Sequence, residues 1–168
     1  MTGESITVTD PRFCDQVVQA GPIALVIDPM GRIIGHEVGH LDSHRLWRQF
    51  LTDVIGTDVT EVTGSSGRSV ARFYLWRSIG RGASGASAQL NATAMMLLAD
   101  YQDDATFDAT PVFGTVVLTG LNERTWAPEP LTADQRRSAA AAIIAAERYA
   151  QAVTAVLRDG GRADTDRR

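Results

Sequence analysis

The chain has 168 residues, of which 44% are hydrophobic and 21% are charged. This balance is typical of one globular domain with its own core, and it argues against a disordered or fibrous protein. The formal net charge of −4 argues against general nucleic-acid binding, which needs a broadly basic surface. Every basic residue is an arginine. The net negative charge still allows a local cluster of these arginines on the surface.

The cysteine count and the hydropathy pattern indicate in which cellular compartment the protein is expected. The chain has one cysteine, Cys14, and so cannot form an internal disulfide, which favours a reducing compartment. We expect a cytoplasmic protein. Because no run of about eighteen apolar residues occurs and residues 1–10 are polar, we expect neither a membrane span nor a signal peptide, and no membrane partner.

The first elements in the chain read as a hairpin. Residues 1–20 are interpreted as a polar lead-in to a single domain that spans 21–157. Residues 23–27 are a β-branched stretch of strand length. The sequence Asp-Pro-Met-Gly at 28–31 predicts a turn, because proline presets the second turn position and glycine relieves the fourth. Residues 32–41 are then predicted to be the second strand of a β-hairpin.

A helix and two shorter strands follow the hairpin. The helix is predicted at 42–56, where Asp42 or Ser43 caps its start and apolar residues recur at helical spacing. Strands are predicted at 59–63 and 70–79 on either side of a turn rich in glycine and serine.

The second half predicts a helix at 87–101 and a strand at 112–121. Thr-Ala-Asp-Gln at 132–135 is a capping box, in which threonine and glutamine satisfy each other's free amides. The alanine-rich helix that it opens is predicted to end near Leu157, and 158–168 is expected to be a disordered tail. Together the elements predict an α+β fold with a single mainly antiparallel sheet of four or five strands and two or three helices packed on it.

The most specific motif is His36-Glu37-Val38-Gly39-His40, which matches the zinc-peptidase signature. In that signature two histidines one helical turn apart bind zinc, and the glutamate activates the metal-bound water. Here the motif follows a turn and precedes the predicted helix start. On a strand the two histidines would lie about 13 Å apart at roughly 3.3 Å per residue, too far for one ion, and the glutamate would point the other way.

A second motif lies in the glycine-rich segment that follows the strand predicted at 70–79. Residues 80–85, Gly-Arg-Gly-Ala-Ser-Gly, fit the dinucleotide fingerprint, yet the repeated βαβ units of that fold are missing. A weaker interpretation is an anion site at the start of the helix predicted at 87–101, where free amides combine with nearby side chains. Its candidate residues are Arg77, Arg81, Gly82, Ser84 and Ser87. The competing interpretation is a solvent-exposed loop.

The tryptophans allow two interpretations. Trp47 lies on the apolar stripe of its predicted helix and is expected in the core. Trp76 and Trp126 lie near predicted loops, where they would serve either as structural residues or as surface anchors for stacking.

Several stretches in order resemble a known family. They are Leu-Val-Ile-Asp-Pro-Met-Gly at 25–31, an asparagine-led alanine-rich helix from Asn91, Phe-Gly-Thr-Val-Val-Leu-Thr-Gly at 113–120, and Leu-Thr-Ala-Asp-Gln at 131–135. This order resembles a domain-of-unknown-function family of small plasmid and phage proteins from GC-rich bacteria, over about residues 23–145. The family usually has proline where this chain has Ala92. The resemblance implies an extended histidine segment but no activity.

Two functions are carried forward. The leading one is a non-enzymatic binding or interaction protein of a mobile genetic element, which sequesters a small anionic ligand or a host protein and uses no cofactor. A homo-oligomer is compatible with it. The alternative is a small zinc metallopeptidase, with His36 and His40 as zinc ligands and Glu37 as the general base.

Overall fold

The computed structural model describes residues 4–6, 12–56, 59–64, 73–78, 89–101, 111–122 and 124–165. For 4–6, 59–64, 98–101, 150–151 and 153–165 only the backbone is described. The elements in chain order are β1 (Glu4–Ile6), α1 (Phe13–Gln19), β2 (Ile23–Ile27), β3 (Ile33–Glu37), α2 (His44–Ile55), β4 (Val59–Gly64), β5 (Tyr74–Ser78), α3 (Ala92–Tyr101), β6 (Val116–Asn122), β7 (Ala127–Glu129) and α4 (Ala133–Thr165).

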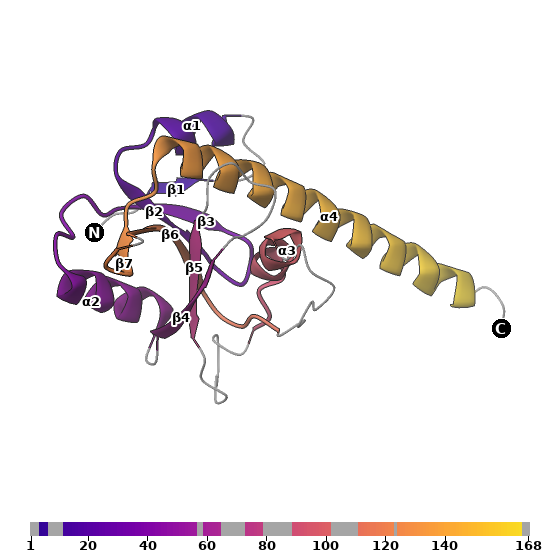
Figure 1. Ribbon diagram of the computed structural model, residues 1–168. Coiled ribbons are helices and arrows are strands. Elements are labelled where there is room, and N and C mark those ends of the chain that lie inside the picture. The colour runs from indigo at the N-terminus through magenta and orange to yellow at the C-terminus, as the bar shows by residue number, and fades with distance from the viewer. Residues whose placement is uncertain are drawn as a thin grey trace.

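The strands form one sheet in the order β1-β3-β2-β6-β5-β4, and β7 pairs with β6 (Figure 1). Each pairing between the described strands is antiparallel. The predicted α+β class with one antiparallel sheet is therefore confirmed. The five longer strands agree with the expected number, and the three-residue strands β1 and β7 extend the sheet.

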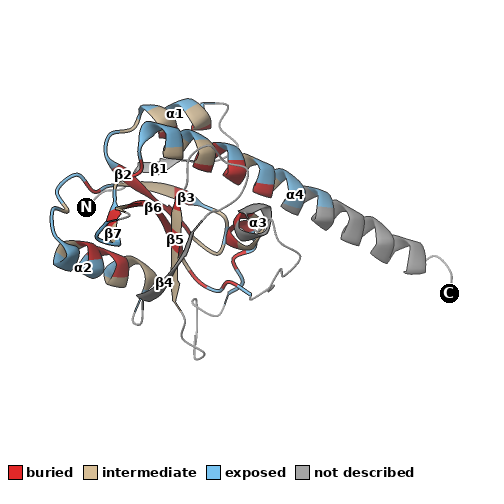
Figure 2. Ribbon diagram, viewed as in Figure 1, coloured by how far each residue is buried: buried red, intermediate tan, exposed pale blue. Residues whose placement is uncertain are grey.

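The sheet is covered on both faces by helices. Alternate residues of a strand point to opposite faces, so each strand contributes to two cores. On one face Leu25, Leu75 and Leu118 pack against α1, α3 and α4. On the other face Ala24, Val26 and Val117 pack against α2. Figure 2 shows the buried side of α2 and the buried side of α4 turned toward the sheet.

The two central strands show the effect of double coverage. All five residues of β2 and six of the seven residues of β6 are buried. The polar member of this set is Thr119, whose hydroxyl donates to the carbonyl oxygen of Gly120 at 2.7 Å and accepts from Trp76 Nε1 at 2.8 Å. Continuous apolar strands of this kind are what a sheet between two helical layers requires.

Local capping chemistry sets the helix ends. Ser43 caps α2 by accepting from the amide of Leu46 at 3.3 Å, and Gly56 follows its last turn with a φ of 100°. At the start of α4, Thr132 N donates to Gln135 Oε1 at 2.9 Å and Gln135 N donates to Thr132 Oγ1 at 3.2 Å. The predicted capping box is therefore confirmed.

The hairpin turn is also confirmed. The amide of Gly31 donates to the carbonyl oxygen of Asp28 at 2.9 Å. The amide of Asp28 in turn donates to the carbonyl oxygen of Arg32 at 3.0 Å. Gly31 has a φ of 78°, and a Cβ there would lie 2.9 Å from Glu147 Oε1. The positive φ therefore favours glycine here, whereas the Glu147 carboxylate, at the end of a flexible side chain, could move aside.

Both chain ends differ from the prediction. Residues 1–20 were expected as a lead-in, but they supply β1 and α1, and Phe13 and Val17 of α1 are buried in the core. The tail expected to be disordered from residue 158 contains the last part of α4, which continues to Thr165. A pair of glycines costs a helix only about 1 kcal/mol each, which is not enough to end one by itself.

Asn91 joins three parts of the fold at the start of α3. It is fully buried, and its Oδ1 accepts from the amide of Ala94 at 2.9 Å, which caps the helix. Its Nδ2 donates to the carbonyl oxygens of Ile27 at 3.1 Å and Gly114 at 2.9 Å. One side chain thus holds the helix against the end of β2 and the approach to β6, so its polar atoms are satisfied in the core.

Candidate functional site

The histidine motif does not lie on a helix. Strand β3 ends at Glu37, residues 38–41 form a turn, and α2 begins at His44. The strand predicted over residues 32–41 is confirmed for His36 and Glu37, but it is wrong for residues 38–41, where the amide of Leu41 donates to the carbonyl oxygen of Val38 and closes a turn. His36 pairs across the ladder with Ala24, Glu37 is exposed on the strand end, and His40 is exposed in the turn. The helical spacing that the peptidase alternative requires is therefore absent.

His36 has a packing environment of its own. Its half-buried ring lies 5.7 Å from the ring of Phe50 in α2, at an interplanar angle of 60°. Burial lowers the pKa of the His36 imidazole below its ordinary value, because the charged form loses hydration there. This histidine therefore belongs to the contact between the sheet and α2.

Within the parts of the chain that the structure describes, no group of three or more histidine, cysteine, aspartate or glutamate side chains is placed to hold a metal ion. No described helix is both long enough and apolar enough to cross a bilayer.

Arg77 is the one predicted anion-binding residue that the structure describes. It lies on β5 next to Trp76, which packs toward α2, and two residues after Leu75, which packs toward α1, α3 and α4. By strand alternation Arg77 shares the face of Leu75. The residue is half-buried, and its Nε atom is buried without a hydrogen-bond partner among the described residues.

A buried guanidinium donor without an acceptor is unusual. Leaving a buried donor unsatisfied costs about 1–3 kcal/mol, and more when the group is charged. An incoming carboxylate or phosphate oxygen would satisfy this donor and pair with the charge. Among the described residues, Arg77 Nε is thus a buried donor for which no acceptor is found.

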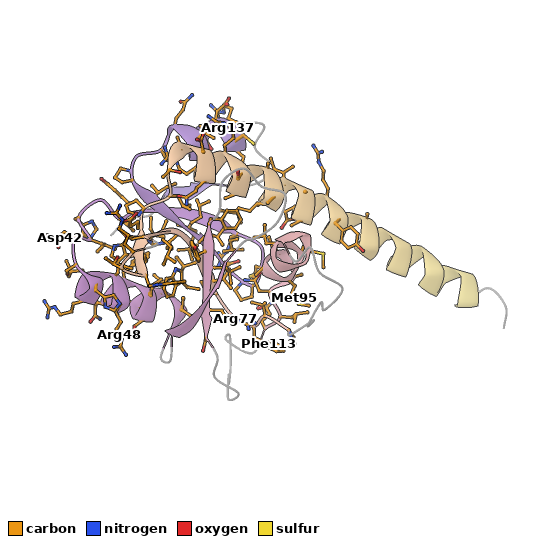
Figure 3. The ribbon with its side chains drawn as sticks, in the orientation of Figure 1. Asp42, Arg48, Arg77, Met95, Phe113 and Arg137 are labelled. Atoms are coloured by element: carbon orange, nitrogen blue, oxygen red, sulfur yellow. The ribbon has the colours of Figure 1, made fainter. Side chains whose placement is uncertain are left out.

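The register of β5 on β6 shows what adjoins Arg77. Trp76, the residue before Arg77, pairs with Val117 of β6, and Val116 is the first residue of that strand. Three residues before Val116 is Phe113, which forms an isolated antiparallel bridge with Leu90. The side chains of Phe113 and Leu90 are 43% and 46% exposed, which is high for large apolar residues. Figure 3 shows Arg77 and Phe113 at the end of the sheet near α3.

The remaining predicted anion-site residues, Arg81, Gly82, Ser84 and Ser87, lie outside the described residues, as does the glycine motif at 80–85. The dinucleotide fold itself is not present in the described sheet, because that fold needs parallel strands and the described pairings are antiparallel.

The tryptophans divide between core and surface. Trp47 is 3% exposed, which confirms the prediction from its helical stripe. Trp76 is half-buried and donates its indole N–H to Thr119, so it is a structural residue. Trp126 is 71% exposed and has a φ of 57° in the turn between β6 and β7.

Sequence reasoning missed Arg136 as a structural residue. Its Nη2 donates to the carbonyl oxygen of Val18 at 3.0 Å and its Nη1 to that of Leu131 at 2.7 Å. Burial lowers the pKa of this guanidinium. The one available signal was its position in the first turn of α4, which does not distinguish it from the neighbouring Arg137.

Comparison with known proteins finds no matching family model, no matching curated protein and no matching solved structure. The resemblance to the plasmid and phage family stays a prediction.

Proposed function

We propose that this chain is a non-enzymatic binding protein that holds a small anionic ligand through Arg77. The observation that supports the proposal is the buried Nε of Arg77, which has no acceptor among the described residues. An accessory role in a phage or plasmid rests on the sequence resemblance alone.

Arginine suits this task better than lysine. Its planar guanidinium offers parallel N–H donors that match the two oxygens of a carboxylate or phosphate. Since Arg77 is half-buried, water competes less for these donors than at an exposed arginine. The exposed apolar side chains of Phe113 and Leu90 on the adjoining segments would contact an apolar part of the same ligand.

The first test is thermal unfolding of the purified chain with inorganic phosphate, sulfate and a panel of nucleotides. A ligand that binds only the folded state raises the melting temperature, and the stabilisation grows with the logarithm of its concentration over its Kd once that ratio exceeds one. At least one anion is expected to raise it. If no anion does so, the proposal is wrong.

Variants then assign the effect to one residue. Arg77→Gln is expected to abolish the shift, and Arg77→Lys to weaken it, because lysine keeps the charge but loses the fork. Arg137→Gln is the matched control, since Arg137 is exposed on α4 and pairs with Asp134. A shift that survives in Arg77→Gln would overturn the assignment.

Stability without ligand gives an independent readout. Because the Arg77 Nε donor has no acceptor among the described residues, Arg77→Met is expected to leave the free energy of unfolding unchanged or to raise it. A loss of several kcal/mol would instead identify Arg77 as a structural residue, in contradiction to the proposal.

A further inference from the structure

Leu90 and Phe113 form one apolar patch on the surface. They are paired in an antiparallel bridge, and both side chains are partly exposed. On either side of the pair, the amides of Asn91 and Gly114 donate across to the facing segment at 2.8 Å and 2.9 Å. A pair flanked in this way is the closer kind of antiparallel pair, with Cα atoms about 4.5 Å apart and side chains on the same side. The two apolar side chains therefore lie together.

Arg77 lies at the same end of the sheet as this patch. Because β5 and β6 are antiparallel, the last residues of β5 lie toward the start of β6, and Phe113 is three residues before that start. Arg77 shares the face of Leu75, whose core Met95 of α3 also contacts. Figure 3 shows Arg77, Met95 and Phe113 at this end, near α3. A ligand held by Arg77 would thus have the apolar patch on its border.

The described side chains of these segments carry very little charge. Residues 73–78, 89–97 and 111–122 contain one ionisable cation, Arg77, and no acidic residue or histidine. A polyphosphate carries several negative charges and is commonly bound by several charged or N–H donors together. A single guanidinium instead matches a single carboxylate, through two parallel N–H donors. The charge in the described segments therefore favours a ligand with one carboxylate.

We infer that the ligand of Arg77 is a monocarboxylate with an apolar body, such as a short aliphatic or aromatic acid. The inference rests on the function proposed above and adds the chemical class of the ligand. Arg77 pairs with the carboxylate, and Leu90 and Phe113 remove the body from water. Each methylene buried in this way raises the affinity by about fourfold. An inorganic anion has no apolar body and gains nothing from the patch.

The test compares three probes on the full chain. Hexanoate has a carboxylate and an apolar body, acetate has the carboxylate with one methyl group, and hexanamide has the apolar body without the charge. The rise of the melting temperature with probe concentration gives each dissociation constant. Hexanoate is expected to bind at least about tenfold more tightly than acetate and than hexanamide. Phosphate is expected to bind no more tightly than acetate.

Variants assign the two parts of the ligand to their residues. Arg77→Gln is expected to weaken hexanoate to the level of hexanamide. Phe113→Ser is expected to remove most of the advantage of hexanoate over acetate and to leave acetate unchanged. Leu90→Ser changes the same patch and is expected to act in the same direction, should Phe113→Ser fail to fold. Trp126→Ser is the matched control, since it removes an exposed apolar side chain beyond the other end of β6 and should change none of these constants.

The outcomes separate this inference from the proposed function. If hexanoate and acetate bind equally well through Arg77, or if a nucleoside triphosphate binds more tightly than hexanoate, the ligand class is wrong and the anion site stands. If Phe113→Ser and Leu90→Ser both leave hexanoate binding unchanged, the apolar patch has no part in the site and the inference is overturned. If none of the anions binds, the inference and the proposed function both fail.

Discussion

The guanidinium of Arg136 on α4 donates to the carbonyl oxygen of Val18 in the last turn of α1, at 3.0 Å and across 118 residues of sequence. The final carbonyls of a helix have no partner within the helix, and this contact satisfies one of them. The same side chain also reaches the carbonyl oxygen of Leu131. Arg136 therefore fastens a short N-terminal helix to a long C-terminal one.

The first prediction concerns this contact. Arg136→Ala is expected to lower the free energy of unfolding by roughly 1.5–3 kcal/mol, because it removes hydrogen bonds from a charged donor to part-buried carbonyls. Arg137→Ala is the matched control, since its exposed pair with Asp134 contributes about 0–1 kcal/mol. Urea unfolding measures both. Equal effects of the two substitutions would contradict the role given to Arg136.

The second prediction follows from His36. Burial lowers the pKa of its imidazole in the folded state, so at mildly acidic pH the unfolded chain binds more protons than the folded chain. Stability contributed by neutral His36 is therefore complete above the ordinary histidine pKa of about 6.5 and is lost as pH falls below it. His36→Gln is expected to flatten the pH dependence of the melting temperature in this window, whereas His40→Gln, in the exposed turn, retains it. An unaltered profile in His36→Gln would refute this account.

The third prediction concerns Asn91. Asn91→Ala removes the cap of α3 and the donor to the carbonyl oxygens of Ile27 and Gly114. We expect a loss of roughly 2–4 kcal/mol, the sum of a cap and of buried carbonyls left unsatisfied. Asn91→Asp is expected to be no better, because its second oxygen faces the two carbonyls. Asn122→Ala, at the half-buried last residue of β6, is the comparison and should cost less. Equal losses at the two sites would show that burial is not the cause.

The fourth prediction compares two glycines. At Gly120 a Cβ would lie 3.0 Å from Gln135 Oε1 and 3.0 Å from the carbonyl oxygen of Pro130, while at Gly21 nothing lies within 4 Å. Gly120→Ala is expected to destabilise the fold by about 1–3 kcal/mol through overpacking. Gly21→Ala should be neutral within about 0.5 kcal/mol. Calorimetric melting of both variants checks the contrast, and a neutral Gly120→Ala would disprove the close approach.

Short-range chemistry was predictable from the sequence, and long-range contacts were not. Ser43 and the Thr132–Gln135 box cap the helices that they were predicted to cap, because the partners lie within three residues. Helix α1 was not predicted, since it depends on Phe13 and Val17 being buried by distant elements. Strand β7 was missed because Pro128 normally argues against a strand.

The candidate site was predictable only in part. The half-buried position of Arg77 follows from the alternation of β5, but its unsatisfied Nε depends on which segments fold over that face. The histidine motif shows the opposite case. Its residues match the zinc-peptidase signature, but they lie at the end of a strand and in a turn and not on the helix that the signature needs.

The pairing of β2 with β6 has a consequence for synthesis on the ribosome. Residues 25–27 hydrogen-bond with residues 116–118, so the middle of the sheet joins segments made far apart in time. The hairpin of β2 and β3 leaves the ribosomal exit tunnel before β6 is made. The edge of β2 that pairs with β6 in the folded protein therefore has no hydrogen-bond partner until β6 emerges. We therefore expect nascent chains truncated before residue 116 to recruit chaperones, and chains extended past α4 to be released from them.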